Sequence, residues 1–305
     1  MLFREPLSSR ANRTGGHDTH SKVEEVTQAM SINEETLIKA LSTLSVLMPG
    51  ERTCDCAPGR LNCLTREETA RYGSTIINVR GRQRWKEKHP ARFIPQLPER
   101  YIQLFSHRGE TVLDPFCGSG TTNVVAKELG RNSIGIDVNP RSVEMTMDRL
   151  RKTRSLPHEV TRHLVAIGDS AEILKLLPEN GIDLIVTSPP YMDVVEYDHD
   201  HPAQLGNVHS YLDFLDSMTD IFAECQRVLK PDGFMIVNTQ DYYSSTRTAP
   251  LHIGYVIRCL PLGFKLVNIN IYILNYSTGG RLVFGYPKSY YPKNDHEFNV
   301  IFRKS

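Results

Sequence analysis

The chain has 305 residues and carries 36 Lys and Arg against 35 Asp and Glu, a net charge of +1. This balance excludes a protein that is basic over its whole surface, so any surface for nucleic acid has to be local. Six cysteines in a chain of this length are no disulfide framework. No apolar run approaches the ~20 residues of a membrane helix, and the first residues lack the apolar core of a signal peptide. We therefore expect a cytoplasmic, reduced protein that has no contact with a membrane.

The chain begins with a polar segment, residues 1–30, which we expect to be a mobile arm. A helix is predicted next, because Ser31 or Asn33 can cap it and apolar residues recur at helical spacing from Leu37 to Leu47. The run Met48–Gly50, which includes a proline and a glycine, ends this pattern.

Three cysteines then lie close together in the sequence: Cys54, Cys56 and Cys63. A tetrahedral zinc site takes four ligands, and they usually come from cysteine pairs with two to four residues between them. The sequence offers three cysteines here, two of them separated by a single residue. This pattern favours a loop with free thiols over a zinc site, and we assign no metal ligand.

The most basic stretch runs from Val79 to Arg92 and surrounds Trp85, the only tryptophan. Such a mixture suits contacts to phosphates together with base stacking. A solvated charged surface with the tryptophan packed inward explains it equally well. We treat residues 31–88 as an N-terminal extension that can contact a nucleic acid. A helix is predicted over Ile94–Phe105.

From Thr111 onward, apolar runs alternate with helical patterns. Helices are predicted near 123–129, 140–151, 170–177, 211–229 and 251–260. Strands are predicted at 111–113, 133–136, 164–167, 182–186, 234–238, 266–274 and 297–303. This alternation predicts an α/β fold with a doubly wound, mostly parallel sheet of about seven strands.

A short glycine motif, Gly118 and Gly120, opens a helix directly after the first of these strands. Glycines let a ligand approach the backbone, and a helix start offers free N–H groups. The third glycine of a dinucleotide fingerprint is missing, because Asn123 occupies its position. The motif therefore favours a cofactor with an amino-acid moiety, whose carboxylate can accept from those N–H groups.

Acidic residues follow the next two strands. Asp137 lies about 20 residues after the glycines, where a carboxylate can accept hydrogen bonds from both ribose hydroxyls. Asp169 ends the third strand and can accept from an adenine amino group. The three strand ends together predict a nucleoside-containing cofactor.

A second motif, Thr187–Tyr191, follows the buried strand at 182–186. Its two consecutive prolines break the strand and leave a small hydroxyl, a carbonyl and an aromatic ring at the strand end. Ligands bind at the carboxyl ends of strands in open α/β sheets, so this motif is a candidate site. An ordinary proline-rich turn is the alternative.

The two motifs, Asp114–Thr122 and Thr187–Tyr191, resemble those of the amino-methylating DNA methyltransferases of the Thr-Ser-Pro-Pro-Tyr type. These enzymes transfer a methyl group from S-adenosylmethionine to N4 of cytosine or N6 of adenine. The resemblance covers residues 89–305 and includes the segments His89–Pro95 and His296–Lys304. It implies a methyltransferase domain of the Rossmann-like class I fold over residues 89–305.

The resemblance also implies roles for individual residues. Ser188 and the carbonyl of Pro189 would accept from the target amino group, with Pro190 shaping the turn and Tyr191 stacking on a base that is flipped out of the duplex. Cys117 is interpreted as a packing residue and not as a nucleophile. The residues assigned to the cofactor are Phe93, Asp114, Phe116, Gly118, Gly120, Thr121, Asp137 and Asp169.

A motif that begins with Ser, as at Ser188, is typical of enzymes that methylate N4 of cytosine, which is the predicted activity. Methylation of adenine N6 is the main alternative. Three further alternatives are methylation of a guanine amino group in RNA, a binding protein without catalysis, and a metal-dependent nucleic-acid module built on the three cysteines. The expected partners are duplex DNA and a cognate restriction endonuclease, and the expected assembly is a monomer or homodimer. Recognition of a DNA site would come from the N-terminal extension and the loops Asp193–His209 and Tyr276–Asn294.

Overall fold

The computed structural model describes residues 30–32, 50–79, 93–157, 159–192, 204–243, 248–274 and 295–305. Several predictions fall outside these ranges: most of the N-terminal arm, the helix expected after Asn33, the basic stretch around Trp85, and most of the two loops expected to read DNA. No helix in the described ranges is both long and apolar enough to cross a membrane.

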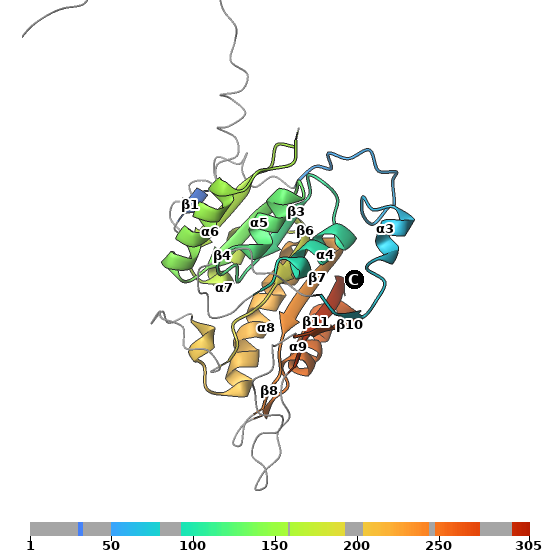
Figure 1. Cartoon of the computed structure of the whole chain (residues 1–305). Helices are drawn as coiled ribbons and strands as arrows, with labels where there is room; N and C mark the ends of the chain where they lie inside the picture. Colours follow the sequence, from blue (N-terminus) through green and yellow to red (C-terminus); the bar gives the residue numbers. More distant parts are fainter. Residues whose placement is uncertain are drawn as a thin grey trace, which may run out of the picture.

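The described residues form a mixed sheet of nine strands in the order β1-β5-β4-β3-β6-β7-β11-β10-β2 (Figure 1). The strands from β1 to β7 along this order run parallel, and β11 is antiparallel to both of its neighbours. The strand bounds are β1 Met30–Ile32, β2 Ile76–Ile77, β3 Thr111–Asp114, β4 Asn132–Asp137, β5 His163–Ile167, β6 Ile182–Thr187, β7 Leu229–Thr239, β10 Phe264–Ile273 and β11 His296–Lys304. A separate two-stranded ribbon joins β8 (Tyr242–Tyr243) to β9 (Thr248–Ala249).

Helices cover both faces of the sheet, which explains why its central strands are apolar on both sides. On one face, Leu113 and Ile185 belong to a core with residues of α7 (Ser170–Ile173), η1 (Leu174–Leu176), α8 (Tyr211–Val228) and α9 (Leu251–Cys259). On the other, Val112 and Val186 pack with residues of α4 (Gln96–Phe105) and α5 (Thr121–Glu128). Residues of α6 (Pro140–Lys152) form a third core with α5 and β5. The short helix α3 (Arg66–Ala70) has no buried residue, and the two single turns η2 (Leu205–Asn207) and η3 (Leu260–Leu262) each pack a leucine against the first core.

The order of the strands reverses between β3 and β6. The chain passes from β3 to β4 and β5 on one side, and from β6 to β7 on the other. Because β3 and β6 are parallel neighbours, with Leu113 opposite Ile185, their carboxyl ends lie together at this switch point. A switch point of this kind is where open α/β sheets bind ligands.

The seven predicted strands are all present, and the doubly wound, mostly parallel α/β sheet is confirmed. The structure adds two short edge strands, β1 and β2, which the sequence analysis missed. Ser31 lies inside β1, paired with Val165, so its predicted role as a helix cap is wrong. A strand of three residues has too few positions for an alternating pattern, and only its pairing with β5 defines it.

The predicted turn after α8 has an unusual form. Leu229 pairs with Ile182 and Phe234 pairs with Leu184, so four residues of β7 bulge out opposite a single residue of β6. Asp232 in this bulge has φ 64°, a left-handed conformation that few side chains adopt. The lysine, proline, aspartate and glycine there interrupt the ladder without ending the strand.

Candidate active site

The two sequence motifs meet through a buried hydrogen bond. Asp114 is the last residue of β3 and Thr187 is the last residue of β6. The Thr187 hydroxyl donates to Asp114 Oδ1 at 2.7 Å, and the backbone N–H of Phe116 donates to the same oxygen at 3.1 Å. Only 2% of Asp114 is exposed. Its carboxylate therefore links the two motifs by hydrogen bonds, and the role in cofactor binding that the resemblance implies for Asp114 stays a prediction.

The environment of Asp114 disfavours its charged form. Burial raises the pKa of its carboxyl group to about 6, although hydrogen bonds from Thr187, Thr122 and the Phe116 backbone act in the opposite direction. The nearby carboxylate of Asp137 adds a smaller increase. At neutral pH the Asp114 carboxylate is therefore ionised in surroundings that disfavour its charge, and this lowers the stability of the folded protein.

Asp114→Asn is expected to gain stability relative to the wild type as the pH rises. The pKa of Asp114 is about 6 in the folded state, above the value of about 3.9 in an unfolded chain. The native state therefore holds the proton more tightly, and the wild type loses stability as the pH rises between these two values. Asn has no proton to lose, so the variant's free energy of unfolding should improve against the wild type by at most about 3 kcal/mol across the window. Urea unfolding at several pH values measures this difference, and a difference independent of pH would contradict the prediction.

The glycine loop after β3 adopts a conformation that only glycine tolerates well. Gly118 has φ 50° and Gly120 has φ 78°. A Cβ atom on Gly120 would lie 2.4 Å from the Thr146 side chain of α6, so the loop also packs too closely for any larger residue. Gly120 caps the N-terminus of α5 with its backbone, which is why the helix begins at Thr121 rather than near Asn123.

Asp137 ties the end of β4 to this loop. Its Oδ2 accepts from the backbone N–H of Gly118 at 2.9 Å, and its Oδ1 accepts from the backbone N–H of Asn139 at 2.9 Å. Asp137 remains half-exposed. A carboxylate offers about four acceptor positions, so one group of this kind can serve several donors at once.

The end of β5 lies at the same edge. Asp169 caps α7 by accepting from the backbone N–H of Ala171 at 2.9 Å, and the hydroxyl of Ser170 donates to the carbonyl of Pro115 in the glycine loop. The structure thus brings together most of the residues predicted for the cofactor. Thr121 is buried as the first residue of α5, and half-buried Phe93 packs against the core formed by α4 and β6.

Ser188 belongs to a polar chain that the sequence analysis missed. Its hydroxyl donates to Asn238 Oδ1 at 3.2 Å, and the amide nitrogen of Asn238 donates to Glu297 Oε2 at 3.0 Å. Asn299 Oδ1 is a second acceptor for that nitrogen at 3.3 Å. Because these two groups accept, the amide oxygen of Asn238 must face Ser188. The Ser188 proton is thereby engaged, and its oxygen is left to accept from another group.

Glu297, at the far end of this series of hydrogen bonds, has a raised pKa. Burial raises the pKa of its carboxyl group to about 7, and the hydrogen bond from Asn238 only partly offsets the increase. No motif marks Asn238 or Glu297, since both occupy ordinary positions in β7 and β11. A polar residue at the end of an apolar strand was the one available signal.

The remaining residues of the second motif line the end of β6. Pro189 is buried, while Pro190 and Tyr191 are partly exposed. Cys117 lies in a core with Val124 and Val143 and is 5% exposed, as expected of a packing residue. Burial raises the pKa of its thiol well above the usual value, so a reactive thiolate is disfavoured.

Curated proteins similar to this chain include Type II methyltransferases. Type II methyltransferase M.BglI from Bacillus subtilis is 40% identical over 140 residues, which are 44% of this chain and 39% of that protein. Type II methyltransferase M.HpaI from Haemophilus parainfluenzae is 48% identical over 65 residues, 21% of each chain. The chain thus spans less than half the length of the curated relatives it matches.

A similar solved structure is that of a candidate DNA modification methylase from Thermus thermophilus complexed with S-adenosyl-L-methionine. It is 30% identical, the alignment covers 45% of this chain and 53% of that one, and the TM-score is 0.35. The family model described as DNA methylase, for N6 and N4 methyltransferases, matches residues 31–148 and 182–305, which is more than half of the chain. With both motifs placed at the switch point of a doubly wound sheet, the chain belongs to the N6/N4 DNA methylase family.

Proposed function

We propose that this protein is an S-adenosylmethionine-dependent DNA methyltransferase that methylates the exocyclic N4 amino group of cytosine in duplex DNA. The observation that carries the proposal is the hydrogen bond from Thr187 to Asp114, because it holds the second motif against the glycine loop. Family membership supports the amino-methylating class. Ser188, as the first residue of its motif's Ser-Pro-Pro-Tyr, favours cytosine; N6 of adenine is the alternative.

The residues around the glycine loop fit the methyl donor. Gly118 and Gly120 carry no side chains, so a ligand can come close to the loop backbone at these two positions, and the start of α5 supplies N–H groups for a carboxylate. Asp137 would accept from the ribose hydroxyls and Asp169 from the adenine amino group, with Phe116 beside them. When bound, S-adenosylmethionine supplies an electrophilic methyl group.

The second motif would activate the target base. An exocyclic amino nitrogen is a weak nucleophile because its lone pair is conjugated with the ring. Ser188 Oγ, with its own proton given to Asn238, and the carbonyl of Pro189 would accept the two amino protons. These bonds favour a tetrahedral nitrogen, whose lone pair then points at the methyl group for direct, in-line attack. This chemistry requires no covalent link between the enzyme and the base.

The base has to leave the duplex to reach this site. Flipping it out costs a few kcal/mol of stacking and pairing, and stacking on the ring of Tyr191 would offset part of that cost. We assign residues 89–305 to the methyltransferase domain and propose that residues 31–88 contact DNA. Within that extension, β2 pairs with β10, and Arg100 donates to the carbonyl of Ser74 at 2.6 Å, so the extension is attached to the sheet. Because the relatives are Type II methyltransferases, we also propose a cognate restriction endonuclease as a partner.

The experiment that tests the proposal identifies the modified base. Purified protein is incubated with duplex plasmid DNA and S-adenosylmethionine, and the DNA is digested to nucleosides for mass spectrometry. We expect N4-methylcytidine in its deoxy form. Exclusive N6-methyldeoxyadenosine would establish the alternative, and methylation of RNA alone would contradict both assignments to DNA.

A further inference from the structure

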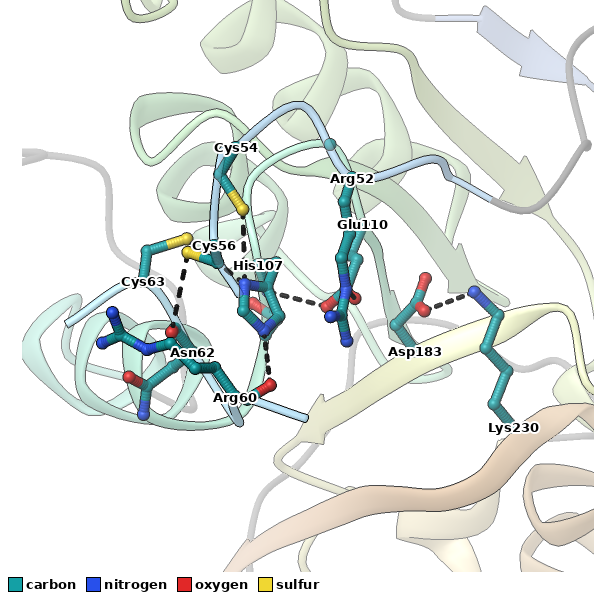
Figure 2. A network of polar contacts seen from close by, with 12 residues as sticks. Arg52, Cys54, Cys56, Arg60, Asn62, Cys63, His107, Glu110, Asp183 and Lys230 are labelled. Atoms are coloured by element: carbon teal, nitrogen blue, oxygen red, sulfur yellow. Dashed lines mark hydrogen bonds and ion pairs between the residues drawn. The ribbon is translucent and has the colours of Figure 1, made fainter. Parts of the chain in front are cut away.

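Three thiols and one imidazole converge near the amino end of β3, at the opposite end of that strand from Asp114. Cys54, Cys56 and Cys63 come from the loop before α3, and His107 comes from the turn between α4 and β3 (Figure 2). Their four candidate ligand atoms all lie within 4.8 Å of one another. The sequence analysis found the cysteines but missed His107, because 44 residues separate it from Cys63.

The spacing of these atoms fits a tetrahedral ion. A zinc ion bonded to sulfur at about 2.3 Å and to nitrogen at about 2.0 Å holds its ligand atoms about 3.5–3.8 Å apart. Nδ1 of His107 lies 3.3 Å from Sγ of Cys54 and 3.5 Å from Sγ of Cys63. Cys56 and Cys54 flank a single residue, and the structure shows that both side chains nonetheless turn toward the same point (Figure 2).

The surroundings of His107 prepare its ring for coordination. The ring is fully buried, and its Nε2 lies 2.9 Å from the carbonyl oxygen of Arg60. A carbonyl only accepts, so Nε2 carries the proton and Nδ1 presents its lone pair to the three sulfur atoms. A backbone carbonyl that fixes the tautomer in this way is a regular partner of metal-bound histidines.

No residue of the loop that carries the cysteines belongs to the three hydrophobic cores. Residues 50–64 contain no helix or strand, and most of them are exposed. The loop's hydrogen bonds to the domain are polar contacts that include Thr53 N–H to the Arg108 carbonyl at 3.0 Å, Arg52 with Glu110 at 2.7 Å, and the Asn62 amide to the Leu104 carbonyl at 2.8 Å. A long loop without an apolar core gains order from a metal cross-link.

We propose that Cys54, Cys56, Cys63 and His107 form a structural zinc site that fastens the N-terminal extension to the methyltransferase domain. Binding of Zn²⁺ would displace the three thiol protons to solvent. Four protein ligands leave no open position for water or substrate, which is the pattern of a structural and not a catalytic zinc. The remote position of the cluster, beyond the far end of β3 from Ser188, agrees with this role. The proposal does not depend on the proposed methylation of DNA.

Metal analysis of the full-length, untagged protein, purified without chelators, tests the site. We expect inductively coupled plasma mass spectrometry to find one zinc ion per chain. Cys63→Ala is expected to lose the metal. The matched control is Cys225→Ala, the same change at a thiol of α8 that is buried in the core, which should keep one zinc per chain.

A second measurement keeps the test decisive if Cys63→Ala fails to fold. Metal-free, reduced wild-type protein is titrated with Co²⁺, and the intense absorption of thiolate-bound tetrahedral cobalt is expected to saturate at one equivalent. Protein purified without zinc that also gives no cobalt–thiolate absorption would overturn the proposal. Full retention of zinc by a folded Cys63→Ala variant would likewise overturn it.

Discussion

Ser188→Ala is expected to lower the turnover of DNA methylation about a hundredfold while binding of S-adenosylmethionine stays unchanged. Loss of one preorganised hydrogen-bond partner of the transition state typically costs a factor of 10²–10³ in turnover. In this protein the Ser188 hydroxyl is oriented by Asn238, so its oxygen is available to accept from the target amino group. Alanine removes that acceptor and leaves the Pro189 carbonyl as the only one at the amino group. Single-turnover kinetics and titration calorimetry with the cofactor measure the two quantities separately.

A matched serine provides the control for this prediction. Ser217 lies partly exposed on α8, and its hydroxyl donates to the Asp213 carbonyl in its own helix, far from both motifs in the sequence. Ser217→Ala should therefore keep wild-type turnover. If Ser188→Ala retained full activity, the proposed activation of the amino group by the second motif would be wrong.

Asp137→Ala is expected to weaken cofactor binding, which Ser188→Ala leaves unchanged. We expect the cofactor affinity to fall about 10- to 100-fold. A hydrogen bond to a charged group contributes about 1.5–3 kcal/mol, and each 1.4 kcal/mol is tenfold in affinity. The change removes the acceptor proposed for the ribose. It also removes the acceptor of the Gly118 N–H, so the glycine loop loses one of its hydrogen bonds to β4 and keeps the bond from the Cys117 N–H to the Ile136 carbonyl.

Two controls separate cofactor binding from folding in this variant. Asp148→Ala changes a half-exposed carboxylate on α6 that pairs with Lys152, so it should leave cofactor affinity unchanged. Thermal unfolding of Asp137→Ala without cofactor reports any general loss of stability. Unchanged cofactor affinity in Asp137→Ala, measured by calorimetry, would remove Asp137 from the proposed cofactor site.

The two variants are informative together because the structure joins their motifs at one point. Ser188 follows Thr187, Asp137 contacts Gly118, and Asp114 links both through its hydrogen bonds with Thr187 and the Phe116 backbone. If Ser188→Ala lowers only turnover and Asp137→Ala lowers only cofactor affinity, the second motif acts on the target base and the glycine loop with Asp137 binds the cofactor.

The order of strands and helices from Thr111 onward could be read from the sequence. Apolar runs such as Ile182–Val186 are long enough to reveal buried strands, and the helical patterns between them are amphipathic. Turn chemistry then marked the strand ends, because glycines at 118 and 120 and two prolines after Ser188 leave few backbone options. These are local properties of the chain, and they located the candidate site.

Contacts between distant residues were decided by the tertiary structure alone. Asn238 becomes the partner of Ser188 because β7 pairs with β6, and Glu297 reaches Asn238 because β11 pairs with β7. His107 joins the three cysteines only because the turn before β3 lies beneath their loop. The buried hydrogen bond between Asp114 and Thr187 likewise depends on the pairing of β3 with β6, which neither motif reveals by itself. Motifs report which backbone shapes a chain can adopt, whereas the partners of a polar side chain depend on which strands become neighbours, and that is set by packing of the whole sheet.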